Sequence, residues 1–256
     1  MSIHWGTQHI DDSEHLEIQF GTHQLIIRTF EEGLQIQHSQ QDEKQHSSTL
    51  KAGHGPTHHN ADSYAKYFST EQNNIEIEPH FPGKPVIIKP EKTYKLLPKQ
   101  QLNTYVTIPL CLHIYTHGRK GLLLETYGDE NLPDAWFGDE NGEACYWHET
   151  TFDFRKQIQT PNPGTIYCPV NFTNLSDEVL EIEKFLLQQE YLNIYQIGEM
   201  ITTDKLSIRF RGLGNESIVS VDKPTPTDQY QLLTEAAKNN VSQLIKKSFD
   251  FFKSIY

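Results

Sequence analysis

The sequence predicts an all-β protein: a β-sandwich of short, mostly antiparallel strands with one C-terminal α-helix. Two patterns predict the strands, because apolar residues alternate with polar ones along many short segments, and glycine or proline separates these segments. The helix is predicted because apolar residues recur at three- and four-residue steps after residue 226. A chain of 256 residues can form one large β-domain. We expect the sandwich to span residues 1–222 and the amphipathic helix to span residues 223–256.

The composition limits the classes of function. The formal net charge is −12, from 22 basic and 34 acidic residues, and such a surface repels nucleic-acid phosphates and anionic lipids. No apolar run approaches the roughly 18 residues of a membrane span, and the N-terminus has no signal-peptide pattern. The odd number of cysteines (Cys111, Cys145 and Cys168) fits reduced thiols. We therefore expect an acidic cytoplasmic protein with no nucleic-acid partner and no membrane span.

The N-terminal segments predict a meander of three strands. Apolar residues alternate with polar ones over residues 16–20, 25–29 and 34–36. Gly21-Thr22 separates the first two segments, and a turn that ends in Gly33 separates the second from the third. Antiparallel neighbours joined by such short turns form a continuous sheet.

A polar, histidine-rich insert follows at about residues 38–60. It contains almost no apolar residue, so we expect a loop. His54, His58 and His59 are candidate metal ligands, because neutral imidazole is a common ligand in proteins. Pro56 opposes the helix that would bring His54 and His58 together, and no carboxylate or cysteine lies at a familiar ligand spacing. A solvated loop is the simpler interpretation.

The longest alternation lies within residues 105–127. Its apolar residues fall on every second position, which predicts one half-buried strand with all of them on one face: Val106, Ile108, Leu110, Leu112 and Ile114. Residues 117–121 supply turn residues, and a second apolar run follows as in a hairpin. Shorter strands, interrupted by prolines, are predicted between residues 63 and 97.

The second half of the sequence predicts further strands. They are expected near residues 144–154, 166–172, 179–187 and 192–201. Residues 206–210 should pair with residues 218–221 across a glycine-containing turn.

The predicted C-terminal helix begins at Thr227 or Asp228, either of which can cap it. Its apolar stripe ends in four large residues: Phe249, Phe251, Phe252 and Ile255. Packing on the protein's own sheet is the simpler interpretation. However, the three phenylalanines spread around the helix too widely for one stripe. The alternative is therefore a helix that forms a homodimer or docks a protein partner.

Aromatic and titratable residues also gather between Trp136 and His148. In a strand, Cys145 and Trp147 point to one face and Tyr146 and His148 to the other. The functional interpretation is a ligand-binding pocket in which Trp136, Tyr146 and Trp147 offer stacking faces. Core packing is the simpler interpretation, since buried cysteine and tryptophan are ordinary core residues.

Residues 136–147 resemble a segment of the domain-of-unknown-function family 432. The shared features are an aromatic residue before glycine, a turn, Asn-Gly, and then cysteine followed by Tyr-Trp. Residues 75–89 and 105–114 are similar to two further segments of that family, and the similarity covers about residues 64–221. The resemblance implies a β-rich domain and implies no catalytic residue. It does not extend to the histidine-rich insert or to the predicted helix.

Common catalytic motifs are absent from the sequence. There is no G-x-S-x-G elbow, no phosphate-binding Walker loop and no dinucleotide fingerprint, so no catalytic residue is predicted and the sequence leaves the cofactor unknown. We therefore expect a soluble cytosolic binding or protein-interaction module. The alternatives are a small-molecule enzyme with an aromatic pocket near Trp136 to His148, and a metal-binding protein that uses the insert.

Overall fold

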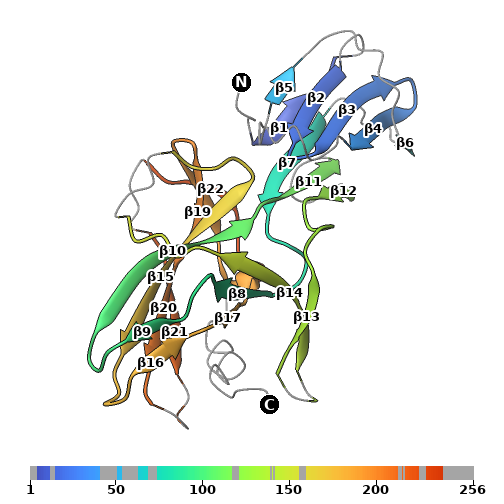
Figure 1. Ribbon diagram of the computed structural model, residues 1–256. Helices are drawn as coiled ribbons and strands as arrows, with labels where there is room; N and C mark the ends of the chain where they lie inside the picture. The colour runs from blue at the N-terminus through green and yellow to red at the C-terminus, as the bar shows by residue number, and fades with distance from the viewer. Residues whose placement is uncertain are drawn as a thin grey trace. The chain divides into compact units, whose positions relative to one another are not determined.

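The computed structural model describes residues 5–11, 15–40, 51–53, 63–68, 74–116, 121–138, 140, 142–155, 160–212, 215, 217–224 and 229–238. These residues form an all-β protein, as predicted (Figure 1). The helical content of this part of the chain is the short 3₁₀ turn η2 (Gln189–Tyr191). Within the same residues, no helix has the length and apolar character to cross a membrane.

The contacts within the chain divide it into two compact units. Unit 1 comprises Met1–His80, Leu110–Gly128 and Asn162–Gly164, and unit 2 comprises Phe81–Pro109, Asp129–Pro161 and Thr165–Tyr256. The division into residues 1–222 and 223–256 that we expected from the sequence does not coincide with this grouping. As a domain assignment it stays a prediction.

The first sheet of unit 1 contains the predicted meander. Its strand order is β5-β2-β3-β4-β6, and every neighbouring pair is antiparallel. These strands are β2 (His15–Phe20), β3 (His23–Phe30), β4 (Gly33–Gln40), β5 (Lys51–Gly53) and β6 (Ser63–Phe68). His38 of the predicted insert therefore lies in a strand, and β5 lies within the insert. The alternating apolar residues of β2, β3 and β4 are buried, which confirms the meander.

The second sheet of unit 1 has the order β1-β7-β11-β12. It consists of β1 (Gly6–His9), β7 (Asn74–His80), β11 (Cys111–Thr116) and β12 (Leu123–Tyr127). β11 and β12 are antiparallel neighbours, so the predicted hairpin is confirmed.

Side chains connect the two sheets of unit 1. The ring centroids of His23 in β3 and Tyr127 in β12 lie 5.4 Å apart. The Tyr67 hydroxyl of β6 donates a hydrogen bond to the Leu124 carbonyl of β12 over 3.1 Å. Both sheets therefore contribute to one core.

The prediction of a single long strand through residues 105–114 is wrong. Val106 and Ile108 lie in β10 (Gln101–Pro109) of unit 2, whereas Leu112 and Ile114 lie in β11 of unit 1. All four are buried, as is Leu110 between the strands. The strand ends at Pro109, because proline lacks the N–H that the next ladder hydrogen bond needs.

Unit 2 is organised around a seven-stranded mixed sheet with the order β21-β20-β15-β19-β18-β22, in which β10 also pairs with β15. β10 is antiparallel to β15, whereas β19 and β20 are parallel to it. The remaining strands are β15 (Thr165–Asn174), β18 (Ile194–Ile197), β19 (Met200–Thr203), β20 (Lys205–Phe210), β21 (Ile218–Asp222) and β22 (Gln231–Thr234). The predicted pairing of residues 206–210 with 218–221 is confirmed by β20 and β21.

Two smaller sheets complete unit 2. One has the order β13-β14-β8-β17, and the other pairs β16 with β9. Their strands are β8 (Val86–Pro90), β9 (Tyr94–Leu96), β13 (Asp134–Phe137), β14 (Glu143–Thr150), β16 (Leu180–Ile182) and β17 (Phe185–Leu187). β14 runs parallel to β8, so their carboxyl ends lie side by side.

The predicted C-terminal helix is not supported. Residues 231–234, which fall in its first turns, form strand β22, antiparallel to β18. Leu233 is buried there, so pairing with a neighbouring strand outweighs the helical spacing of the apolar residues. The candidate interface residues lie outside the described part of the chain: Phe249, Phe251, Phe252 and Ile255.

Candidate functional site: a polar cavity in unit 2

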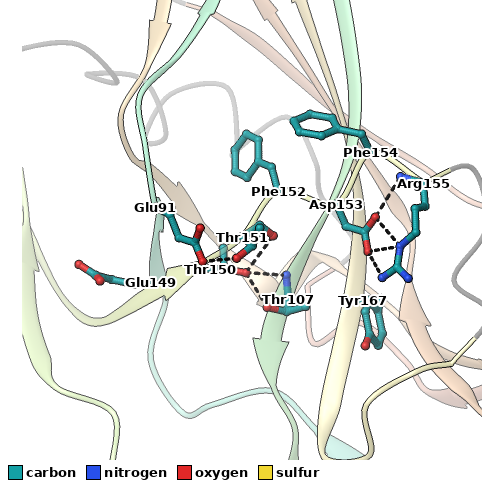
Figure 2. A pocket seen from close by; sticks show the side chains of 10 residues that line it. All are labelled: Glu91, Thr107, Glu149, Thr150, Thr151, Phe152, Asp153, Phe154, Arg155 and Tyr167. Atoms are coloured by element: carbon teal, nitrogen blue, oxygen red, sulfur yellow. Dashed lines mark hydrogen bonds and ion pairs between the residues drawn. The ribbon is translucent and has the colours of Figure 1, made fainter.

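A cavity of about 650 Å³ lies in unit 2. Its lining comes from β10, β14 and β15, from the segment after β14 and from Glu91 directly after β8, and Figure 2 shows the side chains. The lining consists of Glu91, Thr107, Glu149, Thr150, Thr151, Phe152, Asp153, Phe154, Arg155 and Tyr167. Most of these residues are polar or charged.

Backbone hydrogen bonds hold the walls of the cavity. The amide of Tyr105 in β10 donates to the Asp153 carbonyl over 2.8 Å, and the Asp153 amide donates back over 3.0 Å. At the other end, the Glu91 amide donates to the Thr150 carbonyl over 3.2 Å. These bonds tie the segment after β14 to β10 at Asp153, and the end of β14 to the residue after β8.

Threonine hydroxyls form the middle of the cavity. The hydroxyl oxygens of Thr107 and Thr150 lie 2.5 Å apart, and the Thr107 amide donates to the Thr150 hydroxyl over 3.3 Å. The Thr151 hydroxyl donates to the Glu91 carboxylate. These contacts, visible in Figure 2, orient the Thr107 and Thr150 side chains and the Glu91 carboxylate.

An ion pair forms one end of the cavity. Nε of Arg155 donates to both carboxylate oxygens of Asp153 over 2.9 Å, and Nη2 and the backbone amide of Arg155 also donate to that carboxylate. The hydrogen bonds from Arg155 lower the pKa of the Asp153 carboxyl, although partial burial opposes this shift. Asp153 therefore carries its negative charge at neutral pH.

Aromatic rings form the rim. The rings of Tyr94 and Phe152 stack with their centroids 4.8 Å apart, and the Phe154 ring meets Tyr94 edge-on at 5.4 Å. Phe152 is buried, whereas Phe154 is 49% exposed. Figure 2 shows both phenylalanine rings on the side away from Thr107. Phe154 thus offers a firmly packed apolar surface next to polar groups.

The model of the family described as protein of unknown function (DUF432) matches residues 4–253. The chain belongs to this family. The match confirms the resemblance seen at residues 64–221, and it also extends over the histidine-rich insert and most of the C-terminal segment, where we expected none. No curated protein and no solved structure matches.

In this DUF432 protein, the predicted ligand-binding residues do not line the cavity. Trp136 in β13 is 54% exposed, whereas Cys145 is buried with Ile87 and Leu186, and Trp147 packs against that group. Burial, with a smaller contribution from Glu143, raises the pKa of the Cys145 thiol to about 11. Cys145 thus fits the core interpretation, and a ligand role for these residues stays a prediction.

Tyr146 and His148 lie nearer to polar groups. The Tyr146 hydroxyl donates to the Asp129 carboxylate over 3.3 Å, and the Lys84 ammonium lies 4.8 Å from the centre of the Tyr146 ring. Burial lowers the pKa of the His148 imidazole, although a hydrogen bond with the backbone of Thr107 opposes the shift. His148 therefore lies next to a residue that lines the cavity.

The candidate metal ligands His54, His58 and His59 lie outside the described residues. Across the residues that the structure does describe, no group of three or more His, Cys, Asp or Glu side chains could hold a metal ion.

Sequence reasoning also missed a polar cluster in unit 1. Nε2 of His80 lies 3.2 Å from the Glu78 carboxylate and 3.3 Å from the Tyr115 hydroxyl, which also lies 3.0 Å from Nδ1 of His113. The two polar alternations that produce this cluster, Glu76-Glu78-His80 and His113-Tyr115, are visible in the sequence. Their pairing depends on the register of β7 and β11, which the sequence does not show.

Proposed function

We propose that this protein is a soluble cytosolic binding module that holds a small polar molecule in the cavity of unit 2. The observation that carries the proposal is the cavity itself: a lining of mostly polar residues from β10, β14, β15 and the residues that follow β8 and β14, held by backbone hydrogen bonds on both sides. Cavities of this size with a few convergent polar groups are the usual sites of small-molecule binding.

The lining favours binding over covalent catalysis. Its residues include neither a cysteine nor a histidine, and the hydroxyls of Thr107 and Thr150 contact each other rather than a general base. An activated nucleophile needs such a base within hydrogen-bond reach. The lining therefore lacks a nucleophile–base pair built on cysteine or histidine, and its hydroxyl–carboxylate contact is that of Thr151 with Glu91.

We further propose that the two sheets of unit 1 form a β-sandwich. Support comes from the alternating burial of β2 and from the contacts of His23 with Tyr127 and of Tyr67 with Leu124. Face-to-face sheets with interdigitating side chains define that architecture.

A protein-interaction role is the second candidate function, and an apolar surface on unit 1 favours it. Tyr64 and Phe68 of β6 are 68% and 70% exposed, and Leu122 before β12 is 70% exposed. β6 and β12 are edge strands of their sheets, and the Tyr67 hydroxyl joins them. Exposed apolar groups on strand edges are typical of contact sites. Dimerisation through Phe249 to Ile255 stays a separate prediction.

The binding proposal is tested by a ligand-observed NMR screen of small polar metabolites with positive, neutral and negative charge. The wild-type protein is compared with Thr151→Trp, which places a bulky ring at the exposed wall of the cavity. Asp177→Trp is the matched control, because the Asp177 side chain is 93% exposed in a turn that does not line the cavity. We expect at least one compound to bind the wild type and the control but not Thr151→Trp. If every bound compound also binds Thr151→Trp, the cavity is not the site.

A further inference from the structure

We propose that the cavity of unit 2 selects a small organic cation, namely an amine that carries at least one ammonium group. This inference rests on the proposed function, because it names the ligand class of the same cavity. Charge, hydrogen-bonding capacity and the aromatic rim each support it.

The charge of the lining is the first observation. The lining contains three carboxylates (Glu91, Glu149 and Asp153) and one guanidinium (Arg155), which leaves a formal charge of −2. Asp153 already neutralises Arg155 through several hydrogen bonds. The two glutamates therefore dominate the potential at the other end of the cavity, where an anionic ligand would be repelled and a cation attracted.

The ion pair of Lys89 with Glu149, at the glutamate end of the cavity, is weak enough to admit a ligand. Nζ of Lys89 donates to the Glu149 carboxylate over 3.2 Å, but the Lys89 and Glu149 side chains are 43% and 60% exposed. Exposed pairs of this kind contribute little stability. A ligand ammonium can therefore share the Glu149 carboxylate with Lys89.

Hydrogen-bonding capacity is the second observation. A carboxylate only accepts hydrogen bonds and offers about four lone-pair sites, so Glu91 and Glu149 together provide many acceptors. The charged and hydroxyl donors nearby already contact these carboxylates: Thr151 donates to Glu91, Lys89 to Glu149 and Arg155 to Asp153. The complementary ligand is therefore rich in donors, and an ammonium group supplies three of them with a charge.

The aromatic rim is the third observation. Phe154 is half exposed and is held by the edge-on contact of its ring with Tyr94. A cation within about 6 Å of an aromatic face gains electrostatic attraction, and the carbon chain of an amine can also cover the ring. Figure 2 shows Phe154 at the Asp153–Arg155 end, so it suits the carbon chain of an organic cation whose ammonium group lies at the glutamates.

The test uses three probes of equal length that differ in charge: 1,4-diaminobutane, butane-1,4-diol and succinate. Isothermal titration calorimetry on the full chain should show diaminobutane binding at least about tenfold more tightly than the diol, and no binding of succinate. The affinity for diaminobutane should fall as the sodium chloride concentration rises from about 0.1 M to 1 M, because the electrostatic screening length shrinks from about 10 Å to 3 Å. Equal binding of the diol, or any preference for succinate, would overturn the cation assignment.

Matched variants show which carboxylates bind diaminobutane. Glu91→Gln and Glu149→Gln should each weaken diaminobutane binding about tenfold, because each removes one charge and keeps the side-chain shape. Glu181→Gln is the control, since Glu181 also pairs with a lysine, Lys95, over 2.6 Å, but lies in β16 and does not line the cavity. Equal losses in all three variants, or no loss in the first two, would contradict the assignment.

The two proposals fail in different ways. If diaminobutane does not bind, but neutral or anionic metabolites bind the wild type and not Thr151→Trp, then the ligand class is wrong and the binding function stands. If no compound of any charge shows binding that depends on Thr151, both proposals are wrong.

Discussion

The imidazole rings of His80 and His113 stack in unit 1 with their centroids 3.9 Å apart and their planes 8° apart. His113 lies directly across the β7–β11 ladder from Glu78, and the Tyr115 hydroxyl lies within hydrogen-bond distance of both imidazoles. Burial of the His113 ring, and next its neighbour His80, disfavour a positive charge on His113. The cluster therefore makes the stability of unit 1 sensitive to pH.

The first prediction is that unit 1 loses stability as the pH falls from about 6.5 toward 4. Burial, and next the neighbouring His80, lowers the pKa of His113 from 6.5 to about 4, although Glu78 opposes the shift. Between these values the unfolded chain binds more protons than the folded chain, so the contribution of His113 is complete above pH 6.5 and decreases as the pH falls. Because the ring is only partly buried, we expect a loss of about 1–2 kcal/mol.

Urea unfolding followed by NMR signals of unit 1 at pH 7 and pH 5 measures this loss. His113→Gln keeps a polar side chain without a titrating group, so its stability should differ less between the two pH values than that of the wild type. His15→Gln, on β2 in the other sheet of unit 1, is the control and should keep the wild-type pH dependence. If the stability of His113→Gln falls with pH as steeply as that of the wild type, the cluster is not the source of the pH dependence.

The second prediction concerns Gly33 at the start of β4. A Cβ at this position would lie 1.9 Å from the Tyr67 carbonyl oxygen of β6. Gly33→Ala must therefore push β6 away from β4, and we expect the free energy of unfolding to fall by about 1–3 kcal/mol. The exposed aromatic residues of β6 should become mobile at the same time.

Gly21→Ala is the matched control for this prediction. Gly21 has a positive φ of 56°, but no atom lies within 4 Å of the added Cβ. Gly21→Ala should lower the free energy of unfolding by about 1 kcal/mol, through the strain of the positive φ alone. If both variants lose the same stability in chemical denaturation, the close approach of β6 to Gly33 is unimportant.

The sequence predicted those parts of the fold that depend on neighbouring segments. The β2–β3–β4 meander is joined by two-residue turns, so alternation and turn residues together determine the pairing. The same alternation misled us at residues 105–114, because the apolar residues stay in phase while the chain leaves β10 at Pro109 and enters β11 in the other unit. A period of two shows that residues are buried, but not in which core.

The cavity could not be predicted in the same way. Its lining comes from residues as distant in sequence as Glu91 and Tyr167, and the parallel pairing of β14 with β8 brings Thr150 next to Pro90. Parallel strands have no turn between them that would set their register. The aromatic segment Trp136 to His148 ends directly before Glu149, the first residue of β14 that lines the cavity.

The third prediction concerns the thiols. Cys111, Cys145 and Cys168 are all fully buried. Burial raises the pKa of Cys145 to about 11 and that of Cys168 to about 12, so hardly any reactive thiolate forms at neutral pH. A colorimetric disulfide reagent should leave all three thiols unmodified for minutes at pH 7 and should titrate three per chain in urea. Rapid modification of one thiol in the native protein would show that its region opens.

The fourth prediction concerns a buried carboxylate in the large sheet of unit 2. Asp204 is fully buried, between β19 and β20. It accepts hydrogen bonds from the Asn193 amide over 2.8 Å, from the Asn193 side chain over 2.6 Å and from the Tyr195 hydroxyl over 2.9 Å. These three donors take the place of the water that burial removes, since a buried charge without partners is strongly destabilising.

Tyr195→Phe removes one of the three donors and changes little else. Because a hydrogen bond to a buried charged group contributes more than a neutral one, we expect the free energy of unfolding to fall by about 1.5–3 kcal/mol. Tyr146→Phe is the matched control: its hydroxyl also bonds to a carboxylate, that of Asp129, but over 3.3 Å at a partly exposed site. Chemical denaturation should place Tyr146→Phe within about 0.5 kcal/mol of the wild type. If the two variants are equally stable, the Tyr195 hydroxyl does not help to stabilise the Asp204 charge, and the two Asn193 donors are sufficient.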